Sequence, residues 1–113
     1  MPSLESTYQI TESATRSQRL ALFEQHRGIA VSLARRASLR LGRYFDTDTL
    51  LQFALVGLWI AASRFIGEVS LFGAYARPRV SGQIIDELRR ETPGNRRCKL
   101  SEGSFDDVDN WQL

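Results

Sequence analysis

The chain has 113 residues, of which 42% are hydrophobic and 25% are charged, so it fits one small globular domain and is too short for two. Its single cysteine, Cys98, excludes an internal disulfide framework, and its single histidine, His26, excludes a histidine cluster for a metal. The formal net charge is only +2, but arginines concentrate in residues 16–43 and 77–99, whereas acids dominate the residues that follow.

Residues 1–16 are polar and lack periodicity, and we expect them to form a flexible N-terminal arm. From residue 17, apolar side chains recur at steps of three and four residues, which predicts one face of a long first helix. These side chains are Leu20, Phe23, Ala30, Leu33, Ala37 and Leu41. Gly28 is expected to weaken the middle of this helix, and Gly42 is placed to end it.

A second helix is predicted to begin at residues 46–49, which read Asp-Thr-Asp-Thr. Short oxygen-bearing side chains cap the free N–H groups of a helix start, and the acids favour its positive end. The helix continues through residues 50–62 with almost no polar face. It is therefore packed on most sides, either as the central core helix or with part of its apolar surface left for a partner.

A third helical stretch is predicted to begin near Ser70 and to bury a seam formed by Leu71, Phe72, Tyr75, Val80, Ile84 and Leu88. Pro78 lacks a backbone donor and clashes with the preceding turn, so we expect a kink or a fresh helix start there. Residues 92–95, Thr-Pro-Gly-Asn, should stop the helix.

The predicted fold is thus a small all-α domain of three to four helices over residues 17–92, with no strand and with flexible termini. Residues 93–113 are interpreted as an acidic, partly disordered tail. Alternatively, the acidic and aromatic residues of the tail lie along the protein's own basic groove and imitate DNA.

The residues do not support catalysis. The histidine and the cysteine are far apart, no glycine-rich phosphate loop is present, and Asp86 and Glu87 would point about 100° apart on a helix. The longest apolar stretch, residues 53–62, is shorter than the roughly 20 residues that span a bilayer, and no secretory signal precedes it. We expect a cytoplasmic protein that does not contact membranes, is not an enzyme, and uses neither a cofactor nor a metal.

Nucleic-acid binding fits the residues better. Arginines on two predicted helices suit phosphates, and Phe72 and Tyr75 offer rings on which unpaired bases stack. The alternative is that both rings belong to the core, because their spacing of three residues also fits a buried seam.

Three segments follow one another in a specific order. Residues 49–58 read T-L-L-Q-F-A-L-V-G-L, Arg64 and Phe65 come next, and residues 72–89 read F-G-A-Y-A-R-P-R-V-S-G-Q-I-I-D-E-L-R. In order and spacing they resemble region 2 of the flagellar-type bacterial sigma factors. The pattern of that family is D-L-L-Q-x-G-x-I-G-L, then R-[FY], then F-x-x-Y-A-x-x-R-I-R-G-x-[ML]-[IL]-D-E-L-R. The resemblance covers about three fifths of the chain.

The resemblance implies two partners, RNA polymerase core and promoter DNA. The second helix would grip the β′ clamp of the polymerase through Asp48, Leu51, Gln52 and Phe53. The third helix would face the non-template strand of the −10 element, where an aromatic side chain holds an extruded base. The residues implied in DNA binding are Phe72, Tyr75, Arg77, Arg79, Arg89 and Arg90. Tyr75 is the residue favoured to hold the extruded base, because stacking of a base on an aromatic ring contributes about 1–3 kcal/mol against the few kcal/mol that extrusion costs.

The chain also departs from the family pattern. Thr49 stands in place of an acid, Phe53 in place of a small or acidic residue and Ser81 in place of an arginine, and Pro78 is foreign to the motif. The domains that read the rest of a promoter do not follow, so we expect one part of a split sigma factor that works with a second protein. The alternative is a decoy, which occupies an anti-sigma factor or the clamp without melting DNA.

Overall fold

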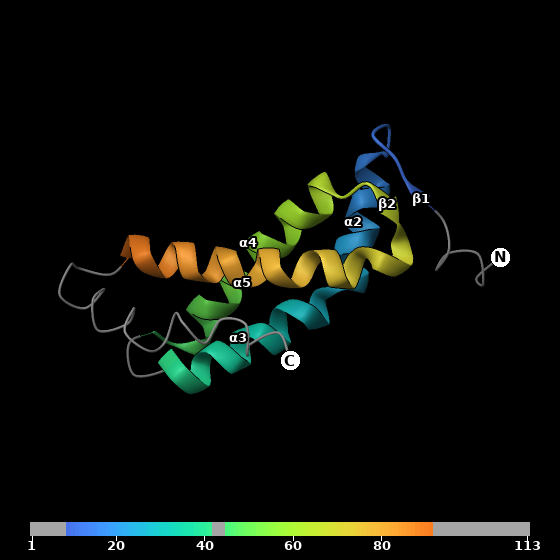
Figure 1. Cartoon of the computed structure of the whole chain (residues 1–113). Helices are drawn as coiled ribbons and strands as arrows, with labels where there is room; N and C mark the ends of the chain where they lie inside the picture. The colour runs from blue at the N-terminus through green and yellow to red at the C-terminus, as the bar shows by residue number, and fades with distance from the viewer. Residues whose placement is uncertain (1–8, 42–44, 92–113) are drawn as a thin grey trace.

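The computed structural model describes residues 9–41 and 45–91, and α-helices make up most of these ranges (Figure 1). The helices are α2 (Arg16–Gln25), α3 (Arg27–Leu41), α4 (Thr47–Arg64) and α5 (Phe72–Glu91), and a 3₁₀ turn, η1 (Val69–Leu71), leads into α5. The predicted all-α class is confirmed. No helix in the described ranges is both long and apolar enough to cross a membrane. The expected acidic tail lies outside the described residues.

Local hydrogen bonds explain where α2 and α4 begin. Thr15 and Gln18 form a reciprocal capping box, in which the Gln18 N–H donates to Thr15 Oγ1 at 3.2 Å and the Thr15 N–H donates to Gln18 Oε1 at 2.8 Å. At α4, the Thr49 N–H donates to Asp46 Oδ1 at 2.8 Å. Hydrogen bonds from the side chain and the backbone of Thr49 lower the pKa of Asp46. The predicted start of the second helix is confirmed.

The predicted long first helix is wrong, because the chain breaks into two helices at His26 rather than weakening at Gly28. The His26 Nδ1 donates to the Leu22 carbonyl at 2.8 Å, which is the carbonyl that the His26 backbone N–H would use in a continuous helix. That N–H instead bonds to the Phe23 carbonyl at 3.1 Å. Because α2 has an axis of its own, a different side of it faces the core. Leu22 is fully buried, whereas Leu20, which was expected in the buried seam, is 45% exposed.

The core forms where α4 packs against α3 and, most extensively, against α5, which lies across it (Figure 1). The buried residues of α4 are Leu50, Ala54, Gly57, Leu58, Ala61 and Ala62. Gly57 lies at the crossing: a Cβ there would be 2.8 Å from Gln83 Cβ and 3.0 Å from Val80 Cα. The two helices therefore approach more closely than any side chain at position 57 would allow.

α5 runs unbroken through Pro78, so the expected fresh helix start is wrong. Pro78 and Ala74 are both exposed, and water can bind the Ala74 carbonyl that loses its helical donor. Leu71 belongs to η1 and is 60% exposed, so it is not part of the seam. The buried residues of α5 are Phe72, Ala76, Val80, Ser81, Ile84, Ile85 and Leu88.

A short strand pair, which the sequence did not predict, closes the turn between α4 and α5. β1 (Gln9–Ile10) pairs antiparallel with β2 (Gly67–Glu68), with Ile10 opposite Gly67. The Ile10 side chain is 1% exposed in the core, and Gly67 has a φ of 144°, a conformation that other residues rarely adopt. The prediction of a flexible arm is therefore wrong from residue 9 onward, and residues 1–8 lie outside the described residues.

Arg19 joins three segments around this turn. Its guanidinium donates to the carbonyls of Ala62 at 2.8 Å and Phe65 at 3.0 Å, both at the end of α4, and to the Thr11 carbonyl at 3.2 Å. The last carbonyls of a helix lack partners within the helix, and a positive charge suits that end. Arg19 therefore holds α2 and the segment after β1 against the end of α4.

Candidate functional site

The polymerase-binding residues expected on α4 lie on two sides of that helix. Asp48 and Gln52 are exposed one turn apart, and Leu51 is partly buried beside them. Phe53 is also partly buried and packs against the core. It points about 100° away from Gln52, because consecutive helix residues differ by that angle. Asp48 and Gln52 thus share the exposed side of α4, with Leu51 on one flank of it, next to Asp48, and Phe53 on the opposite flank.

The same side of α4 continues as a partly exposed apolar surface through Leu55, Val56 and Trp59, which were not among the residues expected at the polymerase. We call it the α4 surface, and its residues are Asp48, Leu51, Gln52, Leu55, Val56 and Trp59. Val56 is 46% exposed, which is unusual within an otherwise core-forming helix. The four-residue repeat from Leu51 through Leu55 to Trp59 is the signal that could have identified this surface.

One end of the α4 surface is supported by α2. The rings of Phe23 and Trp59 meet edge to face with their centroids 5.6 Å apart, and the Arg16 guanidinium lies 5.8 Å from the Trp59 ring. Such contacts hold a large aromatic side chain in one orientation. Trp59 is therefore a fixed part of the α4 surface.

Tyr75 is half-buried at the edge of an aromatic cluster near the start of α5. The centroid of its ring lies 5.0 Å from that of Phe65 and 6.2 Å from that of Phe72. Phe72 is 0% exposed and also contacts His26, with centroids 4.8 Å apart. Phe72 therefore faces the core and is not available for the DNA contact expected of it. Phe65 is also buried, and its role in supporting the Tyr75 ring was not predicted from the sequence.

The exposed side of Tyr75 carries a guanidinium. The Arg79 Cζ lies 4.0 Å from the centroid of the Tyr75 ring, and Arg79 Nη1 donates to the Tyr75 carbonyl at 3.5 Å. Residues four apart share a helix face, so this contact follows from their spacing. Because Phe65 is buried and Arg79 is exposed, the guanidinium covers the ring from the solvent side.

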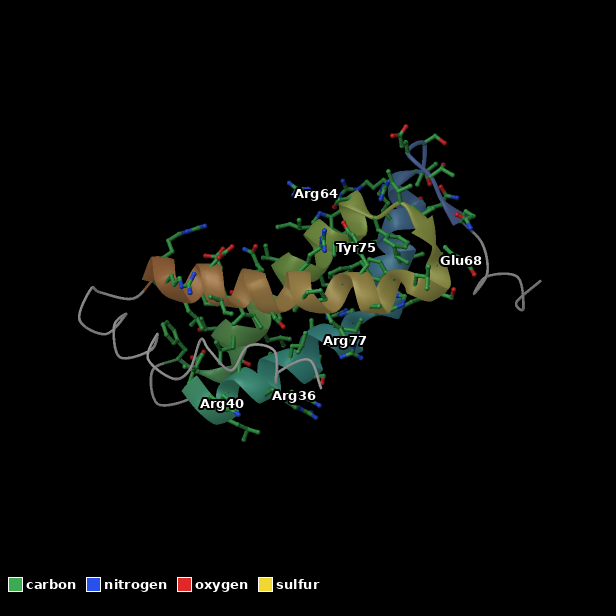
Figure 2. All side chains as sticks on the ribbon, in the orientation of Figure 1. Arg36, Arg40, Arg64, Glu68, Tyr75 and Arg77 are labelled. Atoms are coloured by element: carbon green, nitrogen blue, oxygen red, sulfur yellow. The ribbon has the colours of Figure 1, made fainter. Side chains whose placement is uncertain are left out.

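The remaining arginines expected at DNA do not gather around Tyr75. Arg77 lies about 200° around the helix from Tyr75, and Figure 2 shows it on the side of α3, with Arg36 and Arg40. Arg89 and Arg90 lie in the last turn of α5, about 20 Å along its axis from Tyr75.

Arg90 pairs with Glu87 at 3.4 Å. Figure 2 also places Arg64, at the end of α4, on the same side of α5 as Tyr75. Within residues 9–41 and 45–91, no group of three or more acidic, histidine or cysteine side chains could hold a metal ion.

The structure is thus a small helical module with a partly exposed apolar surface on α4 and exposed arginines on α5. A model of the family described as Sigma-70 region 2 matches residues 22–93, more than half of the chain, and the chain therefore belongs to that family. The family consists of non-enzymatic domains of transcription initiation factors, whose partners are RNA polymerase core and promoter DNA. The protein thus has a sigma-factor-like role in transcription. Neither a search of curated proteins nor one of solved structures returned a match.

Proposed function

We propose that the protein binds the β′ clamp of RNA polymerase core through the α4 surface and presents Tyr75 to unpaired DNA of a promoter −10 element. The observation that carries this proposal is the α4 surface, in which the exposed Val56 adjoins the partly buried Leu51, Leu55 and Trp59, with the exposed Asp48 and Gln52 beside them. An apolar patch with polar residues at its edge is typical of a protein interface. Trp59, which α2 holds in place, adds the type of side chain that often dominates binding energy.

The DNA half of the proposal rests on α5. The Tyr75 ring is partly buried and packs against Phe65, so its orientation is already set before a base arrives. Arg79, and farther along the same side Arg89 and Arg90, would meet the phosphates that follow the base. Arg77 faces α3 and is not part of this set.

Capture of purified core polymerase tests the clamp half. Val56→Asp and Gln52→Ala should reduce capture, because the first places a charge in the apolar stripe and the second removes its amide. Leu39→Asp is the matched control, because Leu39 is 88% exposed on α3, outside the α4 surface. Circular dichroism of all three variants is the check that each is folded. Equal capture of the Val56→Asp protein and the control would contradict the proposal.

Run-off transcription tests the DNA half. Tyr75→Ala should abolish run-off while leaving polymerase capture intact, whereas Tyr75→Phe keeps the stacking ring and should retain activity. As expected from the resemblance, we also propose that a second protein supplies further promoter contacts. Run-off assays with and without a protein that carries a −35-binding domain test this part of the proposal. The resemblance to sigma factors of the flagellar type in particular stays a prediction.

A decoy function is the second candidate, and the covered ring of Tyr75 is the observation that favours it. With Arg79 fixed over the ring, no base could stack there, and the protein would occupy the clamp or an anti-sigma factor without melting DNA. A decoy gives no run-off with any partner, and its capture by polymerase or by an anti-sigma factor is unchanged in Tyr75→Ala.

A further inference from the structure

We infer that Arg79 is a resident occupant of the base-stacking position on Tyr75, and that an unpaired base binds there by displacing it. This inference rests on the proposed DNA role and adds a mechanism of access to the same site. A stacked base lies roughly 3.5–4 Å from the ring beneath it. The Arg79 guanidinium is 4.0 Å from the ring centroid, so it fills the layer that a base would need.

The guanidinium can leave without disturbing the ring. Arg79 is exposed, and its hydrogen bond to the Tyr75 carbonyl is 3.5 Å long, at the limit for such a bond. The Tyr75 ring has separate support from Phe65, at 5.0 Å between centroids, and from Phe72, at 6.2 Å. Displacement therefore exposes a ring that is already in position.

Displacement also places the positive charge of Arg79 near the phosphates that flank the stacked base. A guanidinium that leaves the ring remains within one helical turn of it, and the phosphates flanking the stacked base lie at that distance. Arg79 therefore makes two opposing contributions to DNA binding. It attracts the phosphate, which depends strongly on salt, and it competes with the base for the ring.

The two contributions can be separated by salt and by substitution. The assay is fluorescence anisotropy with labelled oligodeoxythymidylate, whose bases stack little on one another. At high salt, where the phosphate contact contributes little, Arg79→Ala should bind roughly two- to fivefold more tightly than wild type. At low salt this gain should shrink or reverse. Arg79→Lys keeps the charge but lacks a planar group to cover the ring, so it should bind more tightly than wild type at both salt concentrations.

Two matched variants complete the design. Arg90→Ala removes an exposed arginine of the same helix that is far from the ring, so it should lose affinity at low salt and gain none at high salt. In a Tyr75→Ala background, the high-salt gain of Arg79→Ala should disappear, because no ring remains to be uncovered. In NMR spectra of the free protein, the Arg79 side-chain protons should show a ring-current shift that the oligonucleotide removes.

The outcomes distinguish this inference from the function on which it rests. If Arg79→Ala weakens binding at every salt concentration, by the same factor with and without Tyr75, then Arg79 is only a phosphate contact and the inference is overturned. If the wild-type protein binds without any dependence on Tyr75, or does not bind, the proposed DNA role fails and the inference fails with it.

Discussion

Replacing Gly57 with alanine tests whether α4 and α5 are held at the close spacing of their crossing. The new Cβ would lie 2.8 Å from Gln83 Cβ and 3.0 Å from Val80 Cα. Neither atom can move by a change of rotamer, so the two helices must separate. Overpacking of this kind costs roughly 1–3 kcal/mol, and the backbone contact favours the upper end. Since alanine returns about 1 kcal/mol through its better helix propensity, the net loss should be about 2 kcal/mol.

Thermal unfolding followed by circular dichroism measures this loss. In a domain of this size, about 2 kcal/mol should lower Tm by roughly 8–16 °C. Gly82→Ala is the matched control, because Gly82 is also inside a helix and a Cβ there meets no atom within 4 Å. It should raise stability by roughly 0.5–1 kcal/mol. If Gly57→Ala is as stable as Gly82→Ala, the close helix crossing is refuted.

Substitutions at three further positions test other parts of the fold by urea or thermal unfolding. Arg19→Ala should cost about 2 kcal/mol, because it leaves the part-buried carbonyls of Ala62 and Phe65 without their donor, and Arg19→Lys should recover only part of it. Ser81→Ala should be neutral or stabilising by about 1 kcal/mol, because the buried Ser81 hydroxyl has no hydrogen-bond partner among residues 9–41 and 45–91, and a clear loss would contradict this. The pKa of Asp46 is lowered in the folded protein, so its cap stabilises above the unfolded pKa and weakens as pH falls through the folded pKa. Asp46→Asn should lack this acid-dependent loss, and an unchanged pH profile would contradict it.

Features set by neighbouring residues were predictable from the sequence. The start of α4 follows from a capping side chain at Asp46, whereas residues 92–95, which were predicted to stop the third helix, lie outside the described residues. The stack of Arg79 on Tyr75 was also predictable, because the two residues are four apart on one helix, but it was not among the contacts expected above. Phe53 and Arg77 were grouped with the other expected contacts by following a linear motif, whereas the angle around a helix places them on different sides from Gln52 and Tyr75.

Features set by distant segments were not predictable. The pairing of Ile10 with Gly67 joins residues far apart in the chain, and two residues give no alternation that would predict a strand. The break at His26 depends on a hydrogen bond from its ring nitrogen to the Leu22 carbonyl. Helix-propensity scales do not include such side-chain hydrogen bonds to a particular carbonyl. Pro78 is tolerated because it faces outward, and the direction of that face is set by how α5 packs on α4.

The brace formed by Ile10 and Arg19 has a practical consequence. Both residues precede the matched segment, which begins at residue 22, yet one fills the core and the other bonds to the end of α4. A fragment limited to the family segment would therefore lack one core side chain and the hydrogen bonds of Arg19 to the end of α4. A fragment that begins at residue 22 would lose the pairing of β1 with β2 in the turn that leads into α5. Fragments for solution work should therefore begin before residue 9.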